Sequence, residues 1–208
     1  MRDPLLDKSS TPRSRPHQQE SRPGKIDPVE LGRWLRQHRE RLGDRWLAGV
    51  ESRHEGLGDP ARDLLSEFIR LLTRFPPVFL SPYRSHVEPL WAQLSELYGS
   101  VAAMRGLAAG EVIEEFQLLR EEILRLFHDV PPVRELDRLA LRDVLLINRI
   151  VDLGVTHASV GHTDALFFAL FQGSGVANHL TAEQETEVRE QLRAIDSELE
   201  DVTERLEG

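Results

Sequence analysis

The sequence predicts an all-α protein, and three observations carry this prediction. Apolar residues recur at the three- and four-residue spacing of amphipathic helices along most of the chain, no stretch alternates apolar and polar residues, and a heptad pattern occupies residues 181–207. We therefore expect five or six helices around one core, packed as a bundle or in a globin-like arrangement, followed by a C-terminal coiled-coil helix.

The composition divides the chain into three parts. Residues 1–27 hold prolines, serines and arginines with few large apolar groups, so a disordered arm is expected. Residues 28–175 have the apolar content of a folded helical domain, and residues 181–207 form an amphipathic tail. The tail to residue 208 is strongly acidic, with ten acidic against three basic side chains.

Helix boundaries are also readable. Asp27-Pro28 places an N-cap before a proline at the first helical position. This first helical stretch continues to about Val50, and glycines and a proline at 56–60 follow it. A second helical stretch comes next and ends at the Phe-Pro-Pro of 75–77. The spacing of apolar residues predicts further helices over three ranges: 83–104, 109–127 and about 131–171.

The long segment becomes apolar on almost every side from Leu153 to Phe171. Three small residues there would allow another helix to approach closely: Gly154, Ala158 and Gly161. Such a helix needs cover on most sides, either at the centre of the domain or in a dimer interface. It is the nearest thing to a membrane span, but His157, His162 and Asp164 within it favour a buried core helix, and we expect no membrane contact.

The tail carries six apolar residues spaced four, three, four, three and four apart: Val188, Leu192, Ile195, Leu199, Val202 and Leu206. Thr181 and Gln184 form a capping box at its start. A helix of this length spans roughly 40 Å, so we expect the stripe to stay partly uncovered and to pair with a second copy, giving a homodimer axis from Leu153 to Leu206. The alternative is that the tail packs on its own domain.

Composition excludes several functional classes. The chain of 208 residues has no cysteine, so disulfides, thiolate metal sites and a thiol nucleophile are ruled out. Its net charge is −9 and its body lacks a basic field, which argues against nucleic-acid binding. The N-terminus has no apolar run typical of a secretory signal, so a cytoplasmic location is the default expectation.

Sites for chemistry are equally sparse. No phosphate-binding loop, dinucleotide motif, nucleophile elbow or zinc-protease motif is present. Glu51 and His54 form a single Glu-x-x-His, whereas a di-iron bundle requires two. We therefore expect no enzyme activity, metal or cofactor. His157 and Asp164 share one face of a helix with Gly161, where a buried, pH-sensitive polar pair is one interpretation and a solvated strip the other.

One stretch of sequence resembles a known family. Leu97-Tyr98-Gly99, Met104-Arg105-Gly106-Leu107 and the segment from Glu111 to Arg120 together resemble the N-terminal domain of the RsbT co-antagonist (RsbRD) family. Within the last segment, Glu115 and Arg120 are candidate signalling or packing residues. Arg120 could form an ion pair with another helix, and if buried this pair would specify packing more than it would stabilise.

The resemblance implies a globin-like domain without haem that serves as a sensory and dimerising module in stress signalling. Such domains act with sulfate-transporter/anti-sigma-antagonist (STAS) proteins or ahead of regulatory kinases. The chain contains neither a STAS domain nor kinase lobes, so the implied module would act on a partner in trans. The alternative function is a haem- or small-molecule-binding globin-like protein.

Overall fold

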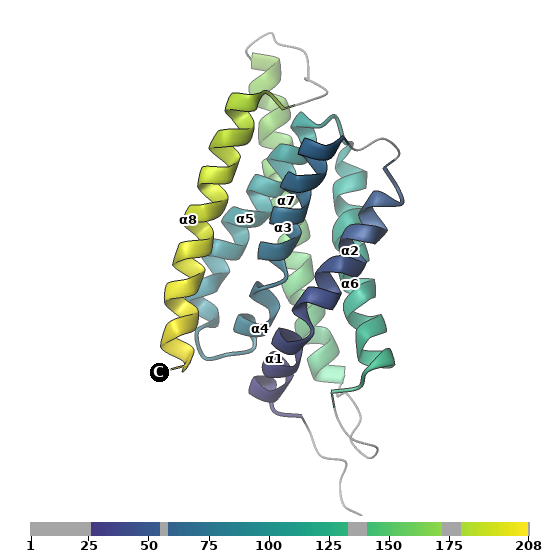
Figure 1. The fold of residues 1–208 in the computed structure, drawn as a ribbon, viewed down its shortest axis with the longest axis vertical. Helices are drawn as coiled ribbons and strands as arrows, with labels where there is room; N and C mark the ends of the chain where they lie inside the picture. The colour runs from purple at the N-terminus through teal and green to yellow at the C-terminus, as the bar shows by residue number, and fades with distance from the viewer. Residues whose placement is uncertain (1–25, 55–57, 133–140, 172–179, 208) are drawn as a thin grey trace, which may run out of the picture.

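The computed structural model describes residues 26–54, 58–132, 141–171 and 180–207, and these contain helices and no strand. They form an elongated bundle in which the long helices run along the longest axis (Figure 1). The helices are α1 (Pro28–Gln37), α2 (Arg39–Glu51), α3 (Asp59–Leu72), α4 (Phe75–Phe79), α5 (Arg84–Met104), α6 (Ala109–Asp129), α7 (Leu141–Phe171) and α8 (Ala182–Glu207).

The all-α prediction is confirmed. The predicted disordered arm lies outside the described residues except for Ile26 and Asp27, and Ile26 is already buried in the core. The segments 133–140 and 172–179, which the sequence assigned to the helical domain and its end, also lie outside the described residues.

The first helix begins where its cap predicts. The Asp27 carboxylate accepts a hydrogen bond from the backbone N–H of Val29 at 2.8 Å. The helical stretch that we expected to run to about Val50 is interrupted at His38, whose φ of −108° and ψ of 8° separate α1 from α2. The His38 Nδ1 donates to the carbonyl of Trp34 at 2.8 Å, so the ring stabilises the end of α1.

The Phe-Pro-Pro sequence does more than end α3. Residues 75–79 form the short helix α4, with its prolines in the first turn where their missing N–H groups cost nothing. All five side chains of α4 are buried. The sequence interpretation missed this helix because prolines were read only as a stop.

The crossing of α5 and α7 confirms the prediction of a close helix approach. A Cβ atom at Gly99 would overlap the backbone carbonyl of Ala158, and one at Gly161 would overlap that of Glu96. Gly154 faces the rings of Trp91 and Phe116. The two backbones can therefore lie against each other only because these positions lack side chains.

The tail helix requires a correction. Its stripe residues Val188, Leu192, Ile195, Leu199 and Val202 are buried within the chain itself, against α3 and α5. Figure 1 shows α8 running alongside α5 and α3. The side chain of the sixth stripe residue, Leu206, lies outside the description.

Our expectation failed because the body is itself elongated. α5 has 21 residues and lies beside a 31-residue α7, so the bundle is long enough to cover a 26-residue helix. The reason for placing a dimer interface on the stripe is thereby removed. The capping box was correct: the Gln184 N–H donates to the Thr181 hydroxyl at 3.2 Å, and the Thr181 N–H donates to the Gln184 side chain at 2.9 Å.

Ion pairs at the border of the stripe hold α8 in register. Arg74, at the end of α3, pairs with Asp196, and Glu67 of α3 pairs with Arg189. The Tyr83 hydroxyl donates to the backbone carbonyl of Arg205 at 3.3 Å. These contacts tie α8 to the bundle near both of its ends.

We predict that Gly161→Ala lowers the free energy of unfolding by about 1–3 kcal/mol, because the added methyl group forces α5 and α7 apart. Urea unfolding measures the change. Gly110→Ala is the matched control: a Cβ there meets no atom within 4 Å, and alanine is favoured over glycine in a helix by up to about 1 kcal/mol. Equal effects of the two substitutions would contradict the tight crossing.

We predict that Leu199→Ala lowers the free energy of unfolding by about 2–5 kcal/mol, because it opens a cavity under α8. Ser197→Ala, on the exposed side of the same helix, should change it by less than about 0.5 kcal/mol. Thermal unfolding at several protein concentrations makes the distinction. A Leu199→Ala variant with wild-type stability but weaker self-association would return the stripe to a dimer interface.

Candidate functional site

The most unusual polar group of the core is Glu115, which is 1% exposed and lies on α6. Its Oε2 accepts a hydrogen bond from the Tyr98 hydroxyl of α5 at 2.6 Å. Its Oε1 accepts one from Nε2 of His54, just after α2, at 2.9 Å. The indole N–H of Trp46 on α2 donates to the Glu115 backbone carbonyl at 2.7 Å. One residue of α6 thus connects to both α2 and α5.

Burial raises the pKa of the Glu115 carboxyl above its ordinary value, while the hydrogen bond from Tyr98 and the charges of Arg105 and His54 act in the opposite direction. Burial also raises the pKa of Tyr98 well above its ordinary value, and the neighbouring Glu115 adds to this effect. The phenol therefore remains a donor, and the carboxyl is the group in this cluster whose charge is costly.

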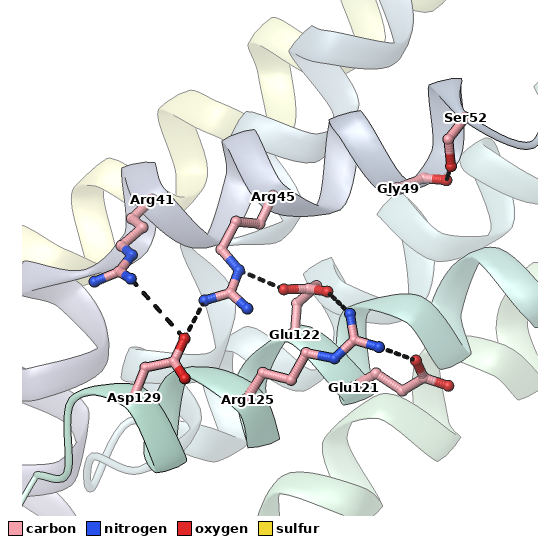
Figure 2. A network of polar contacts seen from close by, with 8 residues as sticks. All are labelled: Arg41, Arg45, Gly49, Ser52, Glu121, Glu122, Arg125 and Asp129. Atoms are coloured by element: carbon pink, nitrogen blue, oxygen red, sulfur yellow. Dashed lines mark hydrogen bonds and ion pairs between the residues drawn. The ribbon is translucent and has the colours of Figure 1, made fainter.

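A second polar network joins α2 to α6 and extends from the buried Glu122 to the exposed Asp129. Arg45 of α2 donates hydrogen bonds to Glu122 at 2.5 Å and to Asp129 at 2.8 Å. Arg125 of α6 donates a further one to Glu122 at 2.6 Å (Figure 2). The hydrogen bond from Arg45 holds the pKa of Asp129 below its ordinary value. Together with the Glu115 cluster, this network fixes α2 along α6.

The two candidate polar residues of the family-like segment have separate positions. Arg120 forms the expected inter-helical ion pair, with Asp152 of α7. The side chains are 29% and 63% exposed, so this ion pair is not a buried one. The Glu115 carboxylate instead accepts hydrogen bonds from His54 and Tyr98, away from this ion pair.

The structure separates His157 from Asp164. His157 Nδ1 donates to the Glu96 carboxylate of α5 at 2.7 Å. Asp164 is exposed, and no hydrogen bond or ion pair involves it within the described part of the chain. The buried polar pair proposed for this face is therefore absent from the described residues, and the solvated strip describes Asp164 correctly.

The sequence interpretation missed two histidines. His162 is buried on α7 and donates from Nε2 to the backbone carbonyl of Leu107 at 2.8 Å. His54 was considered as a partner of Glu51 in a metal site, but Glu51 pairs with Arg62 instead. The position of His162 next to Gly161, on the closely packed face of α7, was a signal that could have indicated its burial.

The C-terminal end of α7 exposes a group of large apolar side chains. Their exposed fractions are 57% for Phe167, 66% for Phe168, 72% for Leu170 and 89% for Phe171. We call these four residues the α7 patch. From Leu153 onward, the buried residues of α7 are Gly154, Ala158, Gly161 and His162, so the expected position at the centre of the domain is not found within the described residues, and the alternative of a dimer interface stays a prediction.

α7 is also long and apolar enough to span a membrane, and 33% of that apolar window is buried in the structure. A core helix of a soluble protein passes the same test, so length and composition alone do not assign α7 to a membrane. Within the described residues, no group of three histidine or carboxylate side chains is arranged to hold a metal ion.

Comparisons of the chain with protein-family models, curated proteins and solved structures found no match. The geometry of the chain itself is therefore the basis of every functional argument.

We predict that Glu115→Gln reduces the dependence of stability on pH. A raised carboxyl pKa in the folded state means that folding favours the neutral form, so wild-type stability declines as the pH rises from the unfolded value, about 4.3, through the folded value. Glutamine cannot ionise. The variant should therefore gain stability relative to wild type across that window, by about 1.4 kcal/mol for each unit of the shift.

The measurement is urea unfolding from about pH 4 to about pH 8, a range that begins near the ordinary glutamate pKa of about 4.3 and extends above it. Glu114→Gln is the control, because Glu114 is exposed and pairs only loosely with Arg53 at 3.4 Å. It should follow the wild-type profile. If the free energies of unfolding of Glu115→Gln and wild type differ by the same amount at every pH, Glu115 has the same charge in the folded and unfolded states.

Proposed function

We propose that this protein is a non-enzymatic, homodimeric signalling module and that the α7 patch is its self-association surface. The observation that carries the proposal is the exposure of three phenylalanines and a leucine at one helix end. Exposed apolar groups of this density are typical of interaction surfaces.

The energetics favour cover for the α7 patch. Burying one large apolar side chain contributes about 1.5–3 kcal/mol. Four such residues can therefore supply several kcal/mol toward association before its entropic cost is subtracted. The segment from Ala165 to Phe171 also has no charged residue, so no ionised group would have to be desolvated there.

A second copy is the simplest occupant. A two-fold symmetric contact brings the same patch of each copy together, and aromatic residues pack well against one another at the centre of such interfaces. The acidic tail helix, whose apolar stripe is already covered, would remain at the outside of the pair.

α7 is well placed to connect this surface to the body. It is closely packed on α5 through Gly99 and Gly161, and it is paired with α6 through Arg120 and Asp152. A change in the packing of α5 or α6 would therefore displace α7 and its patch. In this proposal the signal passes from the body to the dimer, and then to a partner in trans. The RsbRD resemblance suggests STAS proteins or regulatory kinases as these partners. It also suggests that the helical domain is globin-like.

We predict that Leu170→Asp weakens self-association at least about tenfold, the effect of losing about 1.4 kcal/mol. Leu141→Asp is the matched control, because Leu141 and Leu170 are both 72% exposed and lie near opposite ends of α7. Sedimentation velocity over a range of protein concentrations measures the effect. Both positions are exposed, so neither substitution should unfold the domain.

A wild-type protein that remains monomeric at all concentrations would contradict the proposal, as would equal effects of the two substitutions. Binding to phosphatidylcholine vesicles that Leu170→Asp abolishes, in a protein monomeric in solution, would assign the α7 patch to a lipid surface instead.

A further inference from the structure

A groove of about 430 Å³ lies between α2 and α3 and extends to α8, away from the α7 patch. Its volume is within the range of small-molecule sites. Gly43 of α2 leaves space opposite Ile69 and Thr73 of α3. The carboxylates of Glu40 and Asp44 also line the groove.

A smaller pocket of about 90 Å³ adjoins this groove, because Arg39 and Arg74 line both. Its other lining residues are Arg36, Pro77, Val78 and Thr203. Three arginines therefore line one small space whose lining contains no carboxylate. We call this space the arginine pocket.

Arg74 and Arg39 of the arginine pocket differ in their carboxylate partners. The Arg74 side chain is 15% exposed and forms two ion pairs, one with Asp196 and one with Glu200 at 3.6 Å. Arg39 is exposed and forms no salt bridge within the described part of the chain. Guanidinium groups bind oxyanions through paired, charge-assisted hydrogen bonds, so an anion in this space would give Arg39 a partner and add one to Arg74.

We propose that the two connected spaces form a binding site for a small, soluble phosphate ester that carries amino or hydroxyl groups. The phosphate group lies among the side chains of Arg36, Arg39 and Arg74. The remainder of the ligand lies in the groove, where Glu40 and Asp44 accept hydrogen bonds from its amino or hydroxyl groups and Leu47 and Ile69 contact its carbon atoms.

This site would couple a ligand to the tail helix. Arg74 is shared between the pocket and the acidic side chains of α8, and Thr203 of α8 lines the pocket. A bound phosphate competes with Asp196 for Arg74 and at the same time contacts α8 directly. The proposal concerns a different surface from the α7 patch and does not depend on self-association.

Isothermal titration calorimetry of the full chain tests the site, with inorganic phosphate and glucosamine 6-phosphate as probes in a phosphate-free buffer. Both should bind the wild type, and glucosamine 6-phosphate should bind more tightly. Arg39→Ala should weaken both at least about tenfold, because a charge-assisted hydrogen-bond donor is lost. Arg33→Ala, an exposed arginine of α1 outside both spaces, is the control for net charge and should leave both affinities unchanged.

Asp44→Asn separates the groove from the arginine pocket. It should weaken glucosamine 6-phosphate several-fold and leave inorganic phosphate unchanged. Absence of binding by both probes would overturn the proposal. Equal weakening by Arg33→Ala and Arg39→Ala would also overturn it, by showing a diffuse charge effect, as would binding only to vesicles that contain phosphatidic acid.

Discussion

The contact on which the rest of the structure depends is the close approach of the α5 and α7 backbones. Gly99 and Gly161 each face a main-chain carbonyl of the other helix, with no space for a side chain. The Ser100 hydroxyl donates to the Gly161 carbonyl at 3.0 Å, so the crossing is also hydrogen-bonded. With these two helices together, α6 packs along α7, and α3 and α8 complete the bundle around α5 (Figure 1).

The polar groups of the interior follow from this arrangement. The indole N–H of Trp91 donates to the Ile150 carbonyl of α7 at 3.1 Å, and that of Trp46 donates to the Glu115 carbonyl of α6. Each large ring therefore fills the core while its one polar atom is satisfied. Glu115 differs from them, since burial opposes its charge and its two side-chain donors come from different segments, Tyr98 on α5 and His54 after α2. A group of this kind specifies which helices meet more than it stabilises them.

Local features of the fold were predictable from sequence and its long-range partners were not. The cap at Asp27, the capping box of Thr181 and the small residues of α7 are determined by neighbours in the chain or by the face of one helix. The cover of the α8 stripe, the pairing of Glu115 with His54 and the exposure of Phe171 depend on which elements lie side by side. A heptad stripe records that a helix needs an apolar partner, and both a second copy and α5 with α3 meet that need.

The three tryptophans of the chain are all buried, each at a different junction. Trp34 packs against Phe127 of α6 with its ring tilted, and Trp46 lies edge-on to Phe116 of the same helix. Trp91 contacts Phe75 of α4 and the backbone of α7. The intrinsic fluorescence of the protein thus contains three reporters, of which Trp46 and Trp91 share Phe116 as a neighbour. Chains that retain one tryptophan at a time would show optically which junction loosens first when the bundle is perturbed.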